Sequence, residues 1–142
     1  MFGIIMCIIS GAAMSVQGVF NTRLSESTGL LESNFIVQAV AVVLSAISLF
    51  WAKGNMAEAL SVNKLYLTGG IFSIIITITV MLGIKNLSPT IAISIILVSQ
   101  LAAAAMIDAF ALFGSEKVVF GIRKIFGLLV MIAGIIIFSY KK

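Results

Sequence analysis

The chain has 142 residues, of which 61% are hydrophobic and 10% are charged. A soluble domain carries about a quarter charged residues, and an outer surface of this composition would expose more apolar area than solubility allows. The composition therefore predicts an all-α integral membrane protein. The nine Lys and Arg residues outnumber the five Asp and Glu residues, but they flank apolar runs, which is typical of anchoring at lipid headgroups rather than of binding nucleic acid.

Cysteine and histidine usage narrows the chemistry further. Cys7 is alone and the sequence has no His, so we expect no internal disulfide and no metal site built on imidazole or paired thiolates. Catalytic triads that need a His base are excluded as well. We therefore predict that the protein is not an enzyme and has no catalytic residue, metal or cofactor.

Five apolar runs are each long enough, or nearly so, to cross the ~30 Å hydrocarbon core as helices. The first lacks the basic segment of a secretory signal, so we interpret it as a retained helix. Ser88 followed by Pro89 is a helix-start signal for the fourth. The last is slightly short, and lysines at its ends can reach the headgroups. The sequence predicts a single five-helix domain over residues 1–142, with helices at about 2–22, 33–52, 65–84, 89–113 and 122–140.

The basic residues give little orientation bias. An odd number of spans places the two ends of the chain on opposite faces of the membrane. Since Lys and Arg mark the cytoplasmic face, a nearly even count leaves two interpretations: one weakly determined orientation, or insertion in both orientations followed by antiparallel pairing. The side of Met1 carries five basic residues (Lys53, Lys64, Lys117, Arg123 and Lys124) and the opposite side four (Arg23, Lys85, Lys141 and Lys142).

Polar side chains within the runs are the candidate solute-binding residues. Gln17 and Asn21 are large amides four residues apart in the first run, and Gln100 lies near the middle of the fourth. Such amides either hold helices together by hydrogen bonds or line a wet pathway that contacts the solute. Thr77 in the third run is a further cavity candidate, although a Thr hydroxyl can also be satisfied on the preceding helical turn.

Small residues in the first and last runs predict close packing of helices or of two copies. They are Gly11, Ser15, Gly18, Gly127 and Gly134.

Asp108 is the only acid within an apolar run. Intramembrane carboxylates are rare and costly, which makes this residue a candidate for coupling transport to protons or for binding solute. The alternative is structural. Asp108 lies ~28 Å along its predicted helix, near the interface, where it could pair with Arg123, Lys124 or Lys117.

Three segments carry a family resemblance. The chain reads Q-G-V-F-N-T-R-L at Gln17–Leu24 and S-Q-L-A-A-A-A-M-I-D-A-F-A-L-F-G at Ser99–Gly114, followed by Arg123 and Gly127. It resembles the YdcZ-like family of the drug/metabolite transporter superfamily over nearly its whole length. The sequence departs from the family pattern at Ser99, where a Gly usually precedes the Gln. It also departs at Ala109 and Ala111, where His and Gly commonly flank the Phe, and the missing His weakens any proton-coupling scheme based on an Asp–His pair.

The resemblance implies one five-helix half of a ten-helix inverted-repeat bundle in a prokaryotic cytoplasmic (inner) membrane, with a cavity lined mainly by the first, third and fourth helices. It implies a transporter, which we interpret as an exporter working by alternating access. The amides, hydroxyls and single acid of the runs suit a small polar or cationic solute, but they do not identify it. The expected partner is an antiparallel second copy, or alternatively a separately encoded paralogue. A small dual-topology ion channel and a non-transporting scaffold or regulatory subunit are the alternative functions, which scattered polar residues and short loops disfavour.

Overall fold

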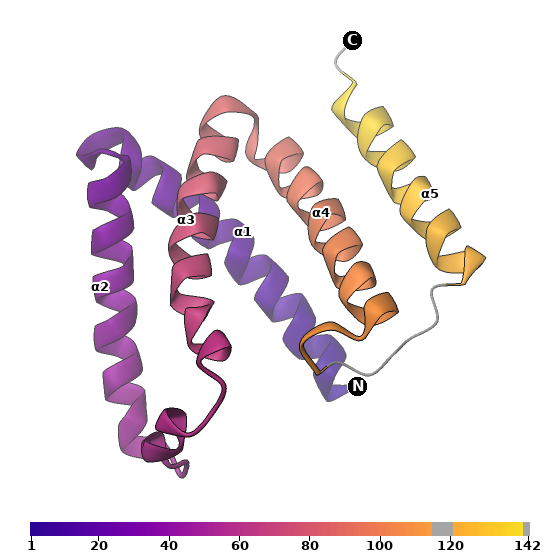
Figure 1. Ribbon diagram of the computed structural model, residues 1–142. Helices are drawn as coiled ribbons and strands as arrows, with labels where there is room; N and C mark the ends of the chain where they lie inside the picture. Colours follow the sequence, from indigo (N-terminus) through magenta and orange to yellow (C-terminus); the bar gives the residue numbers. More distant parts are fainter. Residues whose placement is uncertain (115–120, 141–142) are drawn as a thin grey trace. The chain divides into compact units, whose positions relative to one another are not determined.

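The computed structural model describes residues 1–114 and 121–140, and Figure 1 shows these to be mainly helical. Within these ranges, five helices are long and apolar enough to cross a membrane, which confirms the all-α membrane fold. They are α1 (Phe2–Thr28), α2 (Leu30–Ser48), α3 (Gly69–Asn86), α4 (Pro89–Phe110) and α5 (Ile122–Ser139), with short 3-10 helices η1 (Leu49–Trp51), η2 (Met56–Leu60), η3 (Lys64–Thr68) and η4 (Leu112–Gly114).

The chain forms two compact units, Met1–Asn86 with α1 to α3 and Leu87–Lys142 with α4 and α5. Three lysines of the sequence-based charge count lie outside the described residues: Lys117, Lys141 and Lys142.

The turn between α1 and α2 differs most from the predicted helix ends. α1 continues past residue 22 to Thr28. Arg23 and Glu26 form an ion pair on the surface of this extension, with 3.1 Å between Nη1 and Oε2, and such a pair adds a few tenths of a kcal/mol to the helix. α2 then begins at Leu30, directly after Gly29. Gly29 has a φ of 99°, a conformation that Gly adopts without the steric cost of a side chain, so one residue reverses the chain.

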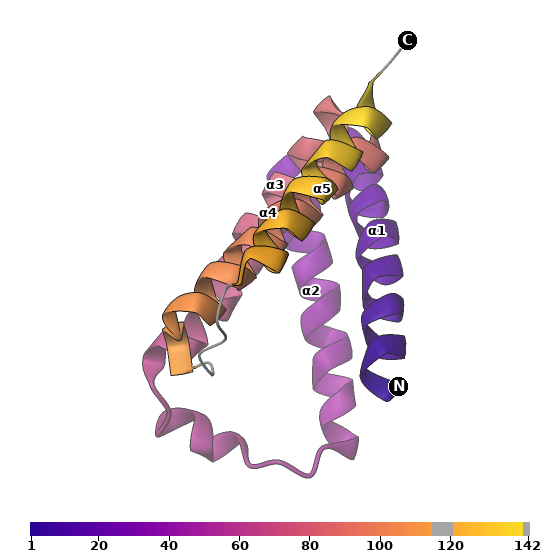
Figure 2. The ribbon, with the colours of Figure 1, turned by 90° about the vertical axis from the view of Figure 1, so that its right-hand side faces the viewer.

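The three helices of the first unit converge at the end that carries Lys85. A Cβ on Gly18 would lie 2.8 Å from Ile84 Cδ1 and 3.2 Å from Val80 Cγ1, so this glycine permits the close approach of α1 and α3. Toward the other end α2 and α3 diverge, and Figure 2 shows the connection through η2 crossing the gap. The buried residues of the unit gather at the convergent end: Gly18, Asn21, Thr22 and Ser25 of α1, Ser33 and Asn34 of α2, and Met81 and Ile84 of α3.

The second unit pairs α4 with α5 in opposite directions (Figure 1). α4 begins as predicted, since Ser88 Oγ accepts a hydrogen bond from the Ile91 N–H at 3.4 Å and Pro89 follows in the first turn. It ends at Phe110 rather than near residue 113. Ala111 adopts a left-handed conformation, φ 50° and ψ 42°, which stops the helix.

Replacing Ala111 with Gly is expected to stabilise the protein. The left-handed conformation costs an L-residue roughly 1–2 kcal/mol, whereas Gly adopts it readily, so Ala111→Gly should raise Tm in detergent by the equivalent of about 1 kcal/mol. Ala109→Gly is the matched control, because the same change inside a helix is unfavourable by ~1 kcal/mol. A fall in Tm for Ala111→Gly would contradict this helix end.

Candidate solute-binding site

The two amides of α1 lie in different surroundings. Asn21 is 9% exposed, and its backbone carbonyl accepts a hydrogen bond from Ser33 Oγ at 3.2 Å. Gln17, one turn earlier, is exposed. Thr22 Oγ1 donates to the Gly18 carbonyl at 2.7 Å, so this hydroxyl is satisfied within its own helix. The structure thus places Asn21 in the interior of the first unit and Gln17 on its surface.

Polar contacts also join α2 to α3. Gln38 Nε2 donates to Ser73 Oγ at 2.9 Å, and Thr77 Oγ1 donates to the Ser73 carbonyl at 2.8 Å. We call this contact the α2–α3 seam, formed by Gln38 with Ser73 and by Ser33, whose Oγ lies 3.6 Å from Met81 Sδ. Gln38 was not among the predicted residues, although Asn34 and Gln38 are two amides four residues apart in an uncharged run, the same signal that pointed to Gln17 and Asn21.

Asn34 is a second residue of α2 that was not among the predicted ones. The residue is 8% exposed, and its Oδ1 is buried without a hydrogen-bond partner. The predicted helix began at residue 33, which gave Asn34 the appearance of a helix-end residue near water. Because α2 begins at Leu30 and packs on α1 and α3 there, the amide lies inside the unit instead.

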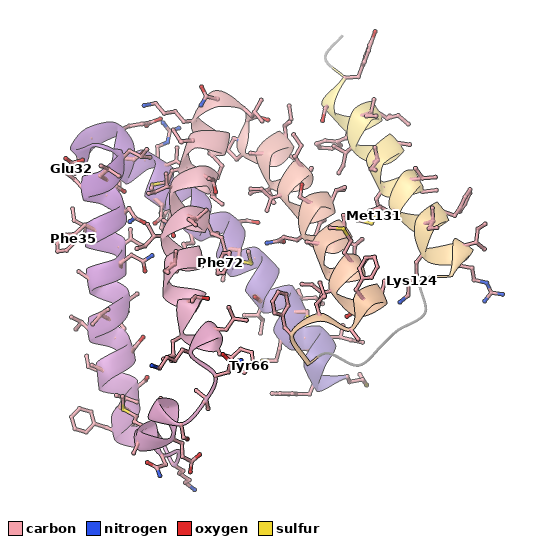
Figure 3. The ribbon with its side chains drawn as sticks, in the orientation of Figure 1. Glu32, Phe35, Tyr66, Phe72, Lys124 and Met131 are labelled. Atoms are coloured by element: carbon pink, nitrogen blue, oxygen red, sulfur yellow. The ribbon has the colours of Figure 1, made fainter. Side chains whose placement is uncertain are left out.

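A groove of about 500 Å³ runs between α4 and α5, a volume typical of small-molecule sites. Asp108 and Lys124 both line it, and Figure 3 shows Lys124 and Met131 pointing from α5 toward α4. Arg123 is exposed and is not among the residues lining the groove. The remaining lining residues are small or apolar: Leu101, Ala104, Ala105, Gly127, Leu128 and Met131.

The other predicted residues lie at varied positions. Gln100 is exposed on α4, and Thr77 is half-buried on α3. A Cβ on Gly11 would meet no atom within 4 Å, while Ser15 Oγ donates to the Gly11 carbonyl at 3.0 Å. Gly134 lines a smaller groove of about 260 Å³ on α4 and α5. Among the small residues, Gly18 is the one that the structure places in a tight contact between helices.

Comparison with known proteins identifies the chain. Residues 2–137 match a family described as "Putative inner membrane exporter, YdcZ". The chain has no significant match among curated proteins or among solved structures. The matched region includes α1 to α4 and nearly all of α5, and the described helices have the length and composition of membrane spans. The chain is therefore a multi-pass inner-membrane protein that belongs to the YdcZ family of exporters.

Proposed function

We propose that the chain is one half of a small-solute exporter. Two copies inserted in opposite orientations form a ten-helix bundle whose cavity opens to each side of the membrane in turn. The observation that carries this proposal is the exposure of Gln17 and Gln100 on two membrane-spanning helices. Hydrocarbon offers a large amide no hydrogen-bond partner, at a cost of several kcal/mol. These faces therefore belong against a polar cavity rather than against lipid.

The two units bury few hydrophobic residues, which supports assembly with a second copy of the chain. The buried hydrophobic residues within 1–114 and 121–140 are Met81, Ile84 and Ala92, and most large apolar side chains are exposed. Lipid can cover these apolar faces, but it cannot satisfy the amides. A second copy brings a second set of amides to the same cavity.

The even distribution of basic residues supports an inverted partner. Many transporters achieve alternating access with two repeats of opposite orientation, and a chain that inserts both ways supplies both repeats itself. The solute class that we propose is small and polar or cationic, because amides, hydroxyls and Asp108 are the polar groups that the spans offer.

Reconstitution into liposomes tests the proposal. The purified chain alone should move at least one member of a panel of polar and cationic solutes, and the flux should respond to an imposed proton gradient. Gln17→Ala and Gln100→Ala should each lower the flux about ten-fold or more while dimer content stays constant, because losing a hydrogen bond to a bound solute removes roughly 1–2 kcal/mol. Gly11→Ala is the matched control, since its Cβ meets open space.

The outcomes of this experiment separate the alternatives. Flux that appears only after a paralogue is added would replace the homodimer with a heterodimer. Unchanged flux and binding in both Gln variants would remove these amides from the cavity. No flux for any solute would contradict the exporter assignment of this chain acting alone.

A further inference from the structure

The groove between α4 and α5 has one charged end and one apolar end. Its lining residues follow the same spacing in both helices, 101, 104, 105 and 108 on α4 and 124, 127, 128 and 131 on α5. Because the two helices run in opposite directions (Figure 1), Asp108 and Lys124 lie at the same end of the groove. Leu101 and Met131 lie at the other end, about 10 Å away along the helices. An acid and a base therefore share one end of an otherwise apolar groove.

The two charges lie at helix ends where they do not stabilise their helices. A helix has partial positive charge at its N-terminus and partial negative charge at its C-terminus, so acids favour the first turn and bases the last. Asp108 is in the last turn of α4, which has no basic residue. Lys124 follows Arg123 in the first turn of α5, which has no acidic residue. Each side chain thus adds to the partial charge of its own helix end instead of offsetting it.

The charge on Asp108 also lacks a partner in the part of the chain that the structure describes. Within residues 1–114 and 121–140, its half-buried carboxylate makes no hydrogen bond or ion pair. At the start of α5, the N-cap residue Gly121 provides no side-chain cap. An uncompensated charge in an apolar span is costly. This end of the groove therefore favours a ligand with a positive group for α4 and a negative group for α5.

The rest of the groove favours an apolar body on the same ligand. Beyond its charged end the walls are leucine, methionine and alanine side chains. A Cβ on Gly127 would meet no atom within 4 Å, so this glycine leaves the groove open at its middle. A volume of about 500 Å³ with apolar walls and a few polar groups that fix orientation is typical of a small-molecule site.

We propose that the α4–α5 groove binds a zwitterionic solute with an apolar body. Its ammonium group contacts Asp108, its acidic group contacts Lys124 and the N-terminus of α5, and its apolar part extends toward Leu101 and Met131. A simple cation would be repelled by Lys124 and a simple anion by Asp108, a cost that a ligand carrying both charges avoids. This inference rests on the proposed exporter function for the identity of its ligand as a solute, and it narrows the solute class.

Four small compounds that differ by one feature test the ligand chemistry. L-leucine carries both charges and an apolar body, whereas 3-methylbutylamine lacks the carboxylate, 4-methylpentanoate lacks the ammonium group and glycine lacks the apolar body. In calorimetric titrations of the purified protein at neutral pH, leucine should bind about ten-fold or more tightly than each of the others, because each has lost a charged contact or the buried body. Equal affinity for any of the three, or no binding of leucine, would overturn the proposal.

Filling the groove tests where leucine binds. Gly127→Leu places a side chain in the open middle of the groove, so it should abolish leucine binding while Tm and dimer content stay close to those of the wild type. Gly134→Leu is the matched control, because a Cβ there also meets open space and the residue lines a different groove. Leucine binding that survives Gly127→Leu, or that Gly134→Leu abolishes equally, would place the site elsewhere.

The role of Lys124 is tested by comparing two of the compounds. Lys124→Gln should weaken leucine binding about ten-fold but should not weaken binding of 3-methylbutylamine, which has no acidic group to contact it. Arg123→Gln is the control and should have a smaller effect, because Arg123 is exposed and does not line the groove. Equal weakening of both compounds by Lys124→Gln would show a structural role of the lysine and would contradict the proposal.

These binding measurements need no transport, so they are independent of the flux experiment. A failed zwitterion site together with flux of another polar solute in liposomes would leave the exporter function standing. The expected binding pattern without flux of any solute would count against the exporter function and would leave the groove as a binding site.

Discussion

Asp108→Asn is expected to abolish the dependence of transport on a proton gradient while the protein stays folded and paired. The side chain lines the groove between α4 and α5, and in the sequence it is the only acid within an apolar run. An amide has nearly the same shape but cannot titrate, so coupling should be lost without loss of packing. Uptake rates in liposomes, measured with and without an imposed gradient, should converge to one value in this variant.

If Asp108 instead stabilises the structure by pairing with a basic residue, a different result is expected. Lys124 shares the groove with Asp108, whereas Arg123 does not line it, so Lys124 is the basic residue to test as its partner. If the two stabilise each other, Asp108→Asn should lower Tm, and the double variant with Lys124→Gln should lose less stability than the two single losses added together. Arg123→Gln is the control and should be additive with Asp108→Asn. A gradient response that survives in Asp108→Asn would rule out coupling through this residue.

The helical architecture could be predicted because it depends on local properties. Run length and hydropathy are readable along the chain, and the requirement that lipid-exposed backbone be internally hydrogen-bonded leaves helices as the outcome for such runs. The start of α4 was also predictable, because Ser88 and Pro89 act within one helical turn. The other helix ends were harder to predict from the sequence. Gly29 alone reverses the chain, and Ala111 stops α4 in a conformation that its residue type disfavours.

The candidate site was harder to predict because it depends on contacts between helices. Gln17 and Asn21 have equivalent spacing and chemistry in the sequence, yet the convergence of three helices buries only Asn21. Gln38 carried the same sequence signal as Gln17 and could have been singled out. Asn34, four residues before Gln38, carried the same signal. Its burial could not be predicted, because it depends on where α2 begins and on the approach of α3.

Adding two lysines to the connection between α2 and α3 is expected to fix one orientation and abolish transport. Ala57 and Ala59 are exposed there, and their replacement by Lys changes the count of basic residues on the Met1 side from five to seven against four. Since Lys in short loops directs the cytoplasmic side, all copies should insert the same way and antiparallel pairs should no longer form. Transport in cells and in liposomes should fall to background.

The orientation itself can be read from a single exposed cysteine. Cys7 is the one native cysteine, so a Cys7→Ala background with Tyr140→Cys at the exposed end of α5 reports which face of the membrane that end occupies. An impermeant thiol reagent should label about half of the unmodified chains, in line with the balanced charges. After Ala57→Lys and Ala59→Lys it should label nearly none or nearly all.

Ala57→Glu with Ala59→Glu is the matched control, because acidic residues contribute little to orientation, and it should keep both populations and the transport activity. Full activity in the uniformly oriented Lys variant would show that the working unit is not an antiparallel pair.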